Sequence, residues 1–202
     1  MTTTKKIIVR LACATVLGTA GVALTQVNIP QTAVVNAATT SVAARALGVD
    51  VASYQNADLS SHAQAGAQFA IVKVSEGTSY RNPKASSQIS TALSNNMMPM
   101  AYHFATFSSN ASAAAAEANY AVQAAQAFGL PKGSYIACDY ETGSGNNIYG
   151  GKTPTANAII AFMDTIKNAG YKPLLYASSS VLQNNIDTNS VIAVSYTHLR
   201  AH

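Results

Sequence analysis

The sequence predicts an α/β protein, with a β/α-barrel-like parallel sheet and flanking helices. Short, apolar, β-compatible segments alternate with helix-forming segments along the chain, and no hairpin signal joins one strand to the next. Several of these strands end in acidic or other polar residues, which is where β/α proteins build their sites. We therefore expect one sheet whose carboxyl-end edge carries the functional residues.

The first 37 residues have the pattern of an export signal. Three basic residues precede an apolar run from Leu11 to Leu24, and small residues surround a plausible cleavage point at Ala37. A retained membrane anchor is the alternative, but the run is about 14 residues long and a spanning helix needs about 20. We expect a secreted or cell-wall-associated protein, with residues 38–45 as a linker.

Composition excludes some classes of partner for the mature chain. The signal holds three of the 12 Lys and Arg residues, which leaves nine against eight Asp and Glu. This balance gives no nucleic-acid signature. Cys138 is the one cysteine outside the signal, so no intramolecular disulfide is expected.

In the first half of the chain, three strands alternate with two helices. The strands are predicted at Leu47–Val51, Phe69–Val74 and Met98–Phe104 from their apolar runs. Helix-forming residues occupy 58–67 and 83–93 between them.

The second half continues the same alternation. Asn110 is expected to cap a long Ala-rich helix that stops at Gly129, and Thr153 to cap a second helix that stops at Gly170. Two further strands are predicted, at 135–138 and at Lys172–Ala177.

The strongest chemical signal follows the fourth strand, as Asp139-Tyr140-Glu141. Side chains at i and i+2 of a strand share a face, which puts the two carboxylates together, with Cα atoms about 6.6 Å apart. These residues could also be the first solvated residues of a loop, although a Gly-rich loop directly after them favours a site. Cys138 should face the other way, into the helix layer.

Polar residues also follow the other strands and could converge on one pocket. His103 could instead be a core histidine, and Lys73 a strand lysine whose stem is buried. The candidates are Asp50, Gln55, Lys73, Glu76, Tyr102 and His103.

Five motifs in order resemble glycoside hydrolase family 25. They are Gly48-Val49-Asp50-Val51-Ala52-Ser53-Tyr54-Gln55, Phe69-Ala70-Ile71-Val72-Lys73-Val74-Ser75-Glu76-Gly77, Ala101-Tyr102-His103-Phe104, Asp139-Tyr140-Glu141 and Leu175-Tyr176. The resemblance covers about residues 46–185. Over this range the chain is similar to the exported bacterial muramidases of that family. It implies a β/α-barrel-like fold, cleavage of the β-1,4 bond after N-acetylmuramic acid in peptidoglycan, and neither a metal nor an organic cofactor.

The resemblance also implies roles for individual residues. Glu141 matches the family's general acid, Asp139 its partner carboxylate and Asp50 the acidic residue of the first strand. The resemblance implies that the negative charges of the two aspartates keep Glu141 protonated. The spacing of the two carboxyl groups leaves open whether cleavage retains or inverts the configuration at the sugar. By analogy with other glycosidase families, we expect the substrate's 2-acetamido group to take part in the reaction. The expected substrate-binding residues are Tyr102, His103, Tyr176, Glu76 and Gln55.

The C-terminus departs from the family pattern. There is no tryptophan-containing motif, and the last residues do not resemble the family. We therefore expect a partial catalytic domain at 46–190, with a barrel incomplete at its C-terminal end, and a foreign tail at 191–202. The β-prone run Val191–Tyr196 could add a makeshift strand.

Two other functions remain open at the level of sequence. One is a non-catalytic module that binds the cell wall, and the other a peptidase or amidase that uses His103 and Cys138. For the favoured muramidase, the expected partners are peptidoglycan glycan strands, with no nucleic acid, no membrane after signal cleavage, and a monomeric state.

Overall fold

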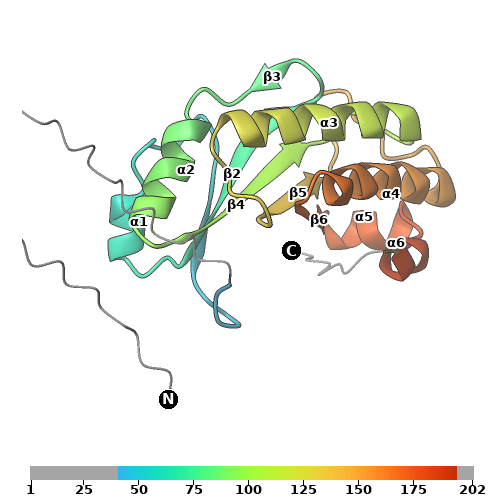
Figure 1. Cartoon of the computed structure of the whole chain (residues 1–202). Coiled ribbons are helices and arrows are strands. Elements are labelled where there is room, and N and C mark those ends of the chain that lie inside the picture. The colour runs from blue at the N-terminus through green and yellow to red at the C-terminus, as the bar shows by residue number, and fades with distance from the viewer. Residues whose placement is uncertain (1–40, 195–202) are drawn as a thin grey trace, which may run out of the picture. The chain divides into compact units, whose positions relative to one another are not determined.

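Five parallel strands form the centre of the structure, a computed structural model that describes residues 41–194 (Figure 1). They lie in the order β1-β2-β4-β5-β6, and the short β3 pairs with β2. The bounds are β1 Gly48–Val51, β2 Phe69–Glu76, β3 Tyr80–Arg81, β4 Met98–Phe104, β5 Tyr135–Asp139 and β6 Lys172–Tyr176. This arrangement confirms the predicted α/β class and the five parallel strands.

Six helices accompany the sheet in the described part of the chain. Four of them, α1, α2, α3 and α4, lie in the connections between parallel strands, as a crossover must when the next strand runs the same way. The bounds are α1 Ser60–Gln64, α2 Ala85–Ser94, α3 Ala111–Ala127, α4 Lys152–Asn168, α5 Ser179–Asn184 and α6 Thr188–Val194.

The caps of the two long helices agree only in part with expectation. Asn110 caps α3, and its side-chain oxygen accepts a hydrogen bond from the Ala113 amide at 3.0 Å. Thr153 does not cap α4, because the helix already begins at Lys152 and its N-cap is Gly151, at φ 96°. A residue without Cβ adopts that backbone conformation at little cost, which explains the earlier start.

The expectation that the chain has no hairpin is wrong at one place. Tyr80 and Arg81 form β3 and pair antiparallel with Glu76 and Ser75 of β2. Gly77, at φ 51°, lets the chain reverse directly after β2. The first helix is also shorter than the predicted 58–67.

The makeshift strand expected at Val191–Tyr196 is also wrong for its described part. Thr188–Val194 is helical, and this helix crosses the predicted boundary between 190 and 191. The Ser190 hydroxyl donates to the Asp187 carboxylate at 2.7 Å, which ties down the start of the helix. The rest of the predicted tail lies outside the described residues.

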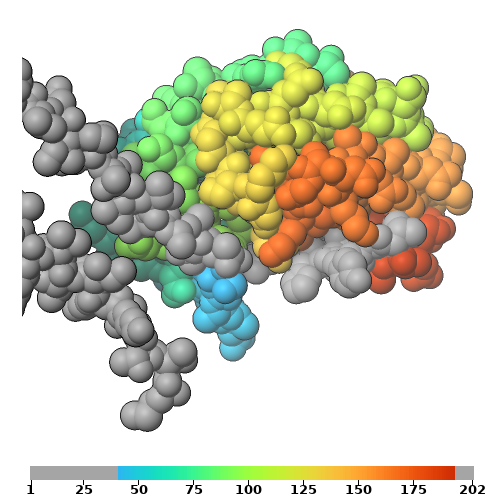
Figure 2. Space-filling model, in the orientation of Figure 1, coloured from blue at the N-terminus to red at the C-terminus, as the bar shows by residue number. Residues whose placement is uncertain are grey.

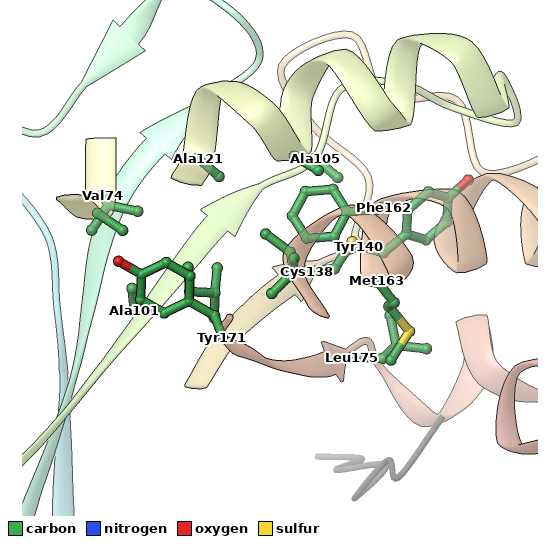
Figure 3. Close-up of a cluster of buried hydrophobic side chains, with 14 of the residues drawn as sticks. Val74, Ala101, Ala105, Ala121, Cys138, Tyr140, Phe162, Met163, Tyr171 and Leu175 are labelled. Atoms are coloured by element: carbon green, nitrogen blue, oxygen red, sulfur yellow. The ribbon is translucent and has the colours of Figure 1, made fainter. Parts of the chain in front are cut away.

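The main core lies between the sheet and the layer formed by α3 and α4, which run side by side (Figures 1 and 2). Figure 3 shows the aromatic ring of Phe162 from α4 among strand residues of this core. Alanines predominate on the α3 face toward the core, and four of them are fully buried: Ala114, Ala118, Ala121 and Ala125. Small side chains let this helix approach the sheet closely.

No helix within residues 41–194 combines the length and the apolar character that crossing a membrane requires.

Candidate active site

Half of the acidic residues of the chain gather at the carboxyl ends of the strands. Asp50, Glu76, Asp139 and Glu141 are four of the eight Asp and Glu residues in the sequence. The charges of Glu141, Asp50 and Glu76 all raise the pKa of Asp139, and Glu141 also raises that of Asp50, so the four share one electrostatic environment. Packing gives no reason to collect like charges there, and this concentration marks the candidate active site.

Asp139 is the most perturbed of these acids. It ends β5 between Phe104 of β4 and Tyr176 of β6. Burial, and then the charges of Glu141 and Asp50, raise its pKa to about 7. Its Oδ1 atom is buried and has no hydrogen-bond partner among the described residues, which leaves this oxygen available to a ligand.

Glu141 lies two residues beyond the end of β5. The strand ladder makes its last contact at Tyr140, whose amide donates to the Tyr176 carbonyl at 2.8 Å. Beyond that point the loop holds the backbone, and the Asn146 side-chain amide donates to the Glu141 carbonyl at 2.7 Å.

Asp50 occupies β1, at the edge of the described sheet, and is exposed. Partial desolvation by the surrounding protein, followed by the charge of Glu141, raises its pKa, and Lys73 opposes that rise. The strands β2 and β4 lie between β1 and β5, yet the charge of Glu141 still acts on Asp50, so both acids belong to the same end of the sheet.

A bulge in β2 brings Lys73 and Glu76 to the same face. The register with β4 shifts between Lys73 and Ser75, so that Val74 and Ser75 are both buried. The Lys73 ammonium donates to the Glu76 carboxylate at 2.5 Å. Burial alone would raise the pKa of Glu76, but hydrogen bonds from Lys73 and Ser144 lower it below the usual value.

Two tyrosines predicted to line the groove lie beside the acidic cluster. Burial raises the pKa of Tyr102, and the negative charges of Asp50 and Asp139 raise it further. The pKa of Tyr176 is raised by burial and then by Glu141 and Asp139. Both phenols therefore stay protonated and can donate hydrogen bonds to a polar ligand.

His103 does not face the acidic cluster, contrary to expectation. Its side chain is fully buried on the helix side of β4, because it alternates with Tyr102 along the strand. Nδ1 lies 2.8 Å from the Ser75 hydroxyl, and Nε2 donates to Glu117 of α3 at 2.8 Å. The alternative of a hydrogen-bonded core histidine describes it correctly.

Gln55 lies in the exposed loop after β1. Its side-chain oxygen accepts a hydrogen bond from the Ala52 amide at 2.8 Å, and its backbone carbonyl accepts one from Lys84 at 2.8 Å. These contacts give Gln55 a role in closing the loop after β1.

Cys138 faces the helix layer, as predicted, and is fully buried. Burial, and then the charge of Asp139, raise the pKa of its thiol well above the ordinary value. A nucleophilic cysteine needs an accessible thiolate, so Cys138 and the buried His103 do not form a peptidase site.

Sequence reasoning missed two loop residues at this site. Ser144 bonds to Glu76, and Asn146 bonds to the Glu141 backbone. Both lie in the Gly-rich loop after Glu141, which the sequence marks only as irregular. Neither residue type indicates a contact with the acids.

The ends of the parallel strands carry clustered carboxyl groups, and one of them retains a proton near neutral pH. Glycoside hydrolases use such a combination of a protonated and an ionised carboxyl group. The model of glycosyl hydrolases family 25 matches residues 49–199, and the chain belongs to this family of glycoside hydrolases. The matched range extends beyond residue 190, where the predicted catalytic domain ends.

Known proteins of similar sequence carry different names. A lysozyme of Lactococcus phage mv1 is 40% identical over 147 residues, which make up 72% of each chain. A protein of Streptococcus phage B30 named D-alanyl-L-alanine endopeptidase is 36% identical over 149 residues, 72% of this chain but 30% of that protein.

A solved structure has the same fold. The Cpl-1 endolysin in complex with a tetrasaccharide-pentapeptide, a peptidoglycan analogue, superposes with a TM-score of 0.62 at 29% identity. The match covers 75% of this chain and 42% of the endolysin.

Proposed function

We propose that this chain is an exported N-acetylmuramidase that hydrolyses the β-1,4 bond between N-acetylmuramic acid and N-acetylglucosamine in peptidoglycan. The observation that carries the proposal is the acidic cluster, in which Asp139 has a pKa of about 7 beside Glu141 and Asp50. Glycoside cleavage needs both a proton donor and negative charge near the oxocarbenium-like centre. Family membership and the lysozymes among its relatives support the substrate.

In the proposed reaction, the raised pKa of Asp139 keeps one proton in the acidic cluster near neutral pH. The proton resides on Glu141 when the glycosidic oxygen leaves, and Glu141 donates it to that oxygen. Asp139 is then ionised and stabilises the positive charge that develops at the sugar.

The free Oδ1 atom of Asp139 has a specific partner in this scheme. It accepts a hydrogen bond from the N–H of the 2-acetamido group of muramic acid, whose carbonyl oxygen attacks the anomeric carbon. Water then opens the cyclic intermediate and returns a proton to Glu141. Tyr102 and Tyr176 donate hydrogen bonds to the sugars.

The site of action and the assembly state belong to the same proposal. Residues 1–37 direct the chain out of the cytoplasm, and the mature protein acts as a monomer on glycan strands. The sequence pattern of the signal supports export.

The test is to incubate the purified mature chain with peptidoglycan and to measure new reducing ends and new free amino groups in parallel. Reducing ends without amino groups are the expected result. Amino groups alone would establish a peptidase or amidase, and binding without either product would establish a cell-wall binding module.

A further inference from the structure

Asn146 is a buried amide that uses both of its polar groups at the active-site loop. Its side chain is buried, with 6% of the residue exposed. The amide nitrogen donates to the Glu141 carbonyl at 2.7 Å, and the amide oxygen accepts from the Ser108 backbone N–H at 2.8 Å. A carbonyl only accepts and an N–H only donates, so the partners fix the orientation of the amide.

These bonds join the loop that follows β5 to the loop that follows β4. Two other bonds connect the same loops: the Tyr140 hydroxyl donates to the Ser108 carbonyl at 2.9 Å, and the Asn147 amide donates to the Ser108 hydroxyl at 2.9 Å. Neither of these two involves the Glu141 carbonyl.

The backbone between Glu141 and Asn146 depends on such a restraint. Gly143, Ser144 and Gly145 have φ values of 138°, 47° and 86°, a turn that the Asn146 amide closes on the Gly143 carbonyl at 2.7 Å. A Cβ on Gly143 would come 3.3 Å from the Phe104 ring, so the turn also packs tightly on β4.

We propose that Asn146 is a positioning residue for the reaction, which fixes the backbone of Glu141 so that its carboxyl meets the glycosidic oxygen. The inference rests on the proposed function of Glu141 as general acid. A displacement of about 1 Å at a reacting group costs up to about 100-fold in rate. Binding of the sugars on neighbouring strands does not need this restraint, so kcat should fall while KM stays nearly constant.

The experiment compares Asn146→Ala, Asn146→Asp and Tyr140→Phe in the mature chain, on soluble peptidoglycan fragments, with reducing ends as readout. Asn146→Asp keeps an acceptor for Ser108 but loses the donor to Glu141. Tyr140→Phe is the matched control, because it removes one bond between the same loops without touching Glu141.

We expect kcat to fall about 10- to 100-fold in both Asn146 variants, with KM within about twofold of the parent, and to change less than about threefold in Tyr140→Phe. Thermal unfolding measured alongside shows whether each variant is folded. Equal losses in Asn146→Ala and Tyr140→Phe, or full activity of Asn146→Asp, would overturn the positioning role. A folded parent chain that releases no reducing ends would instead overturn the proposed function, and the inference with it.

Discussion

Lys73 and Glu76 lie on the same face of β2 although a regular strand would point residues i and i+3 to opposite faces. The bulge at Val74 and Ser75 produces this arrangement, because it adds one residue to β2 relative to β4. The Lys73 ammonium also lies 5.0 Å from the centre of the Phe104 ring. One cation is thereby fixed among four carboxylates, where it opposes the rise of the pKa of Asp50 and of Asp139.

Replacing Lys73 by Met should move the alkaline limb of the pH–activity profile to higher pH. A positive charge favours ionised carboxyls, so its loss raises the pKa of Asp139, and the cluster keeps its proton to higher pH. The matched control is Lys73→Arg, which keeps the charge and should leave the limb near its original position. An unchanged limb in Lys73→Met would show that Lys73 does not influence the essential proton.

Asp139→Asn should shift the same limb in the opposite direction. The substitution removes a neighbouring negative charge that helps the pair to hold its proton, so residual activity should decline at lower pH than in the parent. Overall activity should also fall, because the amide cannot stabilise positive charge. The release of reducing ends, measured from about pH 4 to 9, compares Asp139→Asn with Lys73→Met. Shifts of the alkaline limb in the same direction in both variants would contradict the electrostatic model.

Glu141→Gln should abolish muramidase activity and leave the fold intact. The amide has the shape of the acid but cannot donate the proton, and general acid catalysis contributes about 10²- to 10⁴-fold. Asp164→Asn, at an exposed position on α4, is the control for the loss of one acidic group. Turnover near the parent level in Glu141→Gln would remove Glu141 from the mechanism.

Glu117→Ala should destabilise the chain by about 1–3 kcal/mol, because it leaves the buried Nε2 of His103 without its acceptor. Glu117 also accepts hydrogen bonds from the Thr106 amide at 2.9 Å and from the Thr106 hydroxyl at 2.6 Å. Thr106→Val removes the hydroxyl bond alone and should cost about 1 kcal/mol. Urea unfolding measures both, and equal losses would mean that the His103 contact contributes nothing.

Regular elements were predictable from sequence because their signals are local. The bounds of β4 agree with the predicted Met98–Phe104, and Asn110 caps α3 as its residue type suggests. The antiparallel β3 was missed, because a pair of residues after Gly77 carries no periodicity of its own.

At the site, the direction in which each side chain points was harder to predict from sequence than the strands themselves. Strand alternation correctly sends Cys138 away from Asp139. The same rule sends His103 away from Tyr102, but the motif that contains both suggested a shared pocket. The bulge at Val74 and Ser75 depends on pairing with β4, which no local pattern reveals.

The alanine face of α3 sets how far this helix stands from the sheet, and Glu117 projects from the same helix toward His103. A larger side chain at Ala118 would lift the helix and lengthen that contact before it disturbed any groove residue. His103 in turn contacts Ser75, the neighbour of Glu76. The packing of α3 on one side of the sheet is thus connected, through Glu117, His103 and Ser75, to the strand end that carries Glu76.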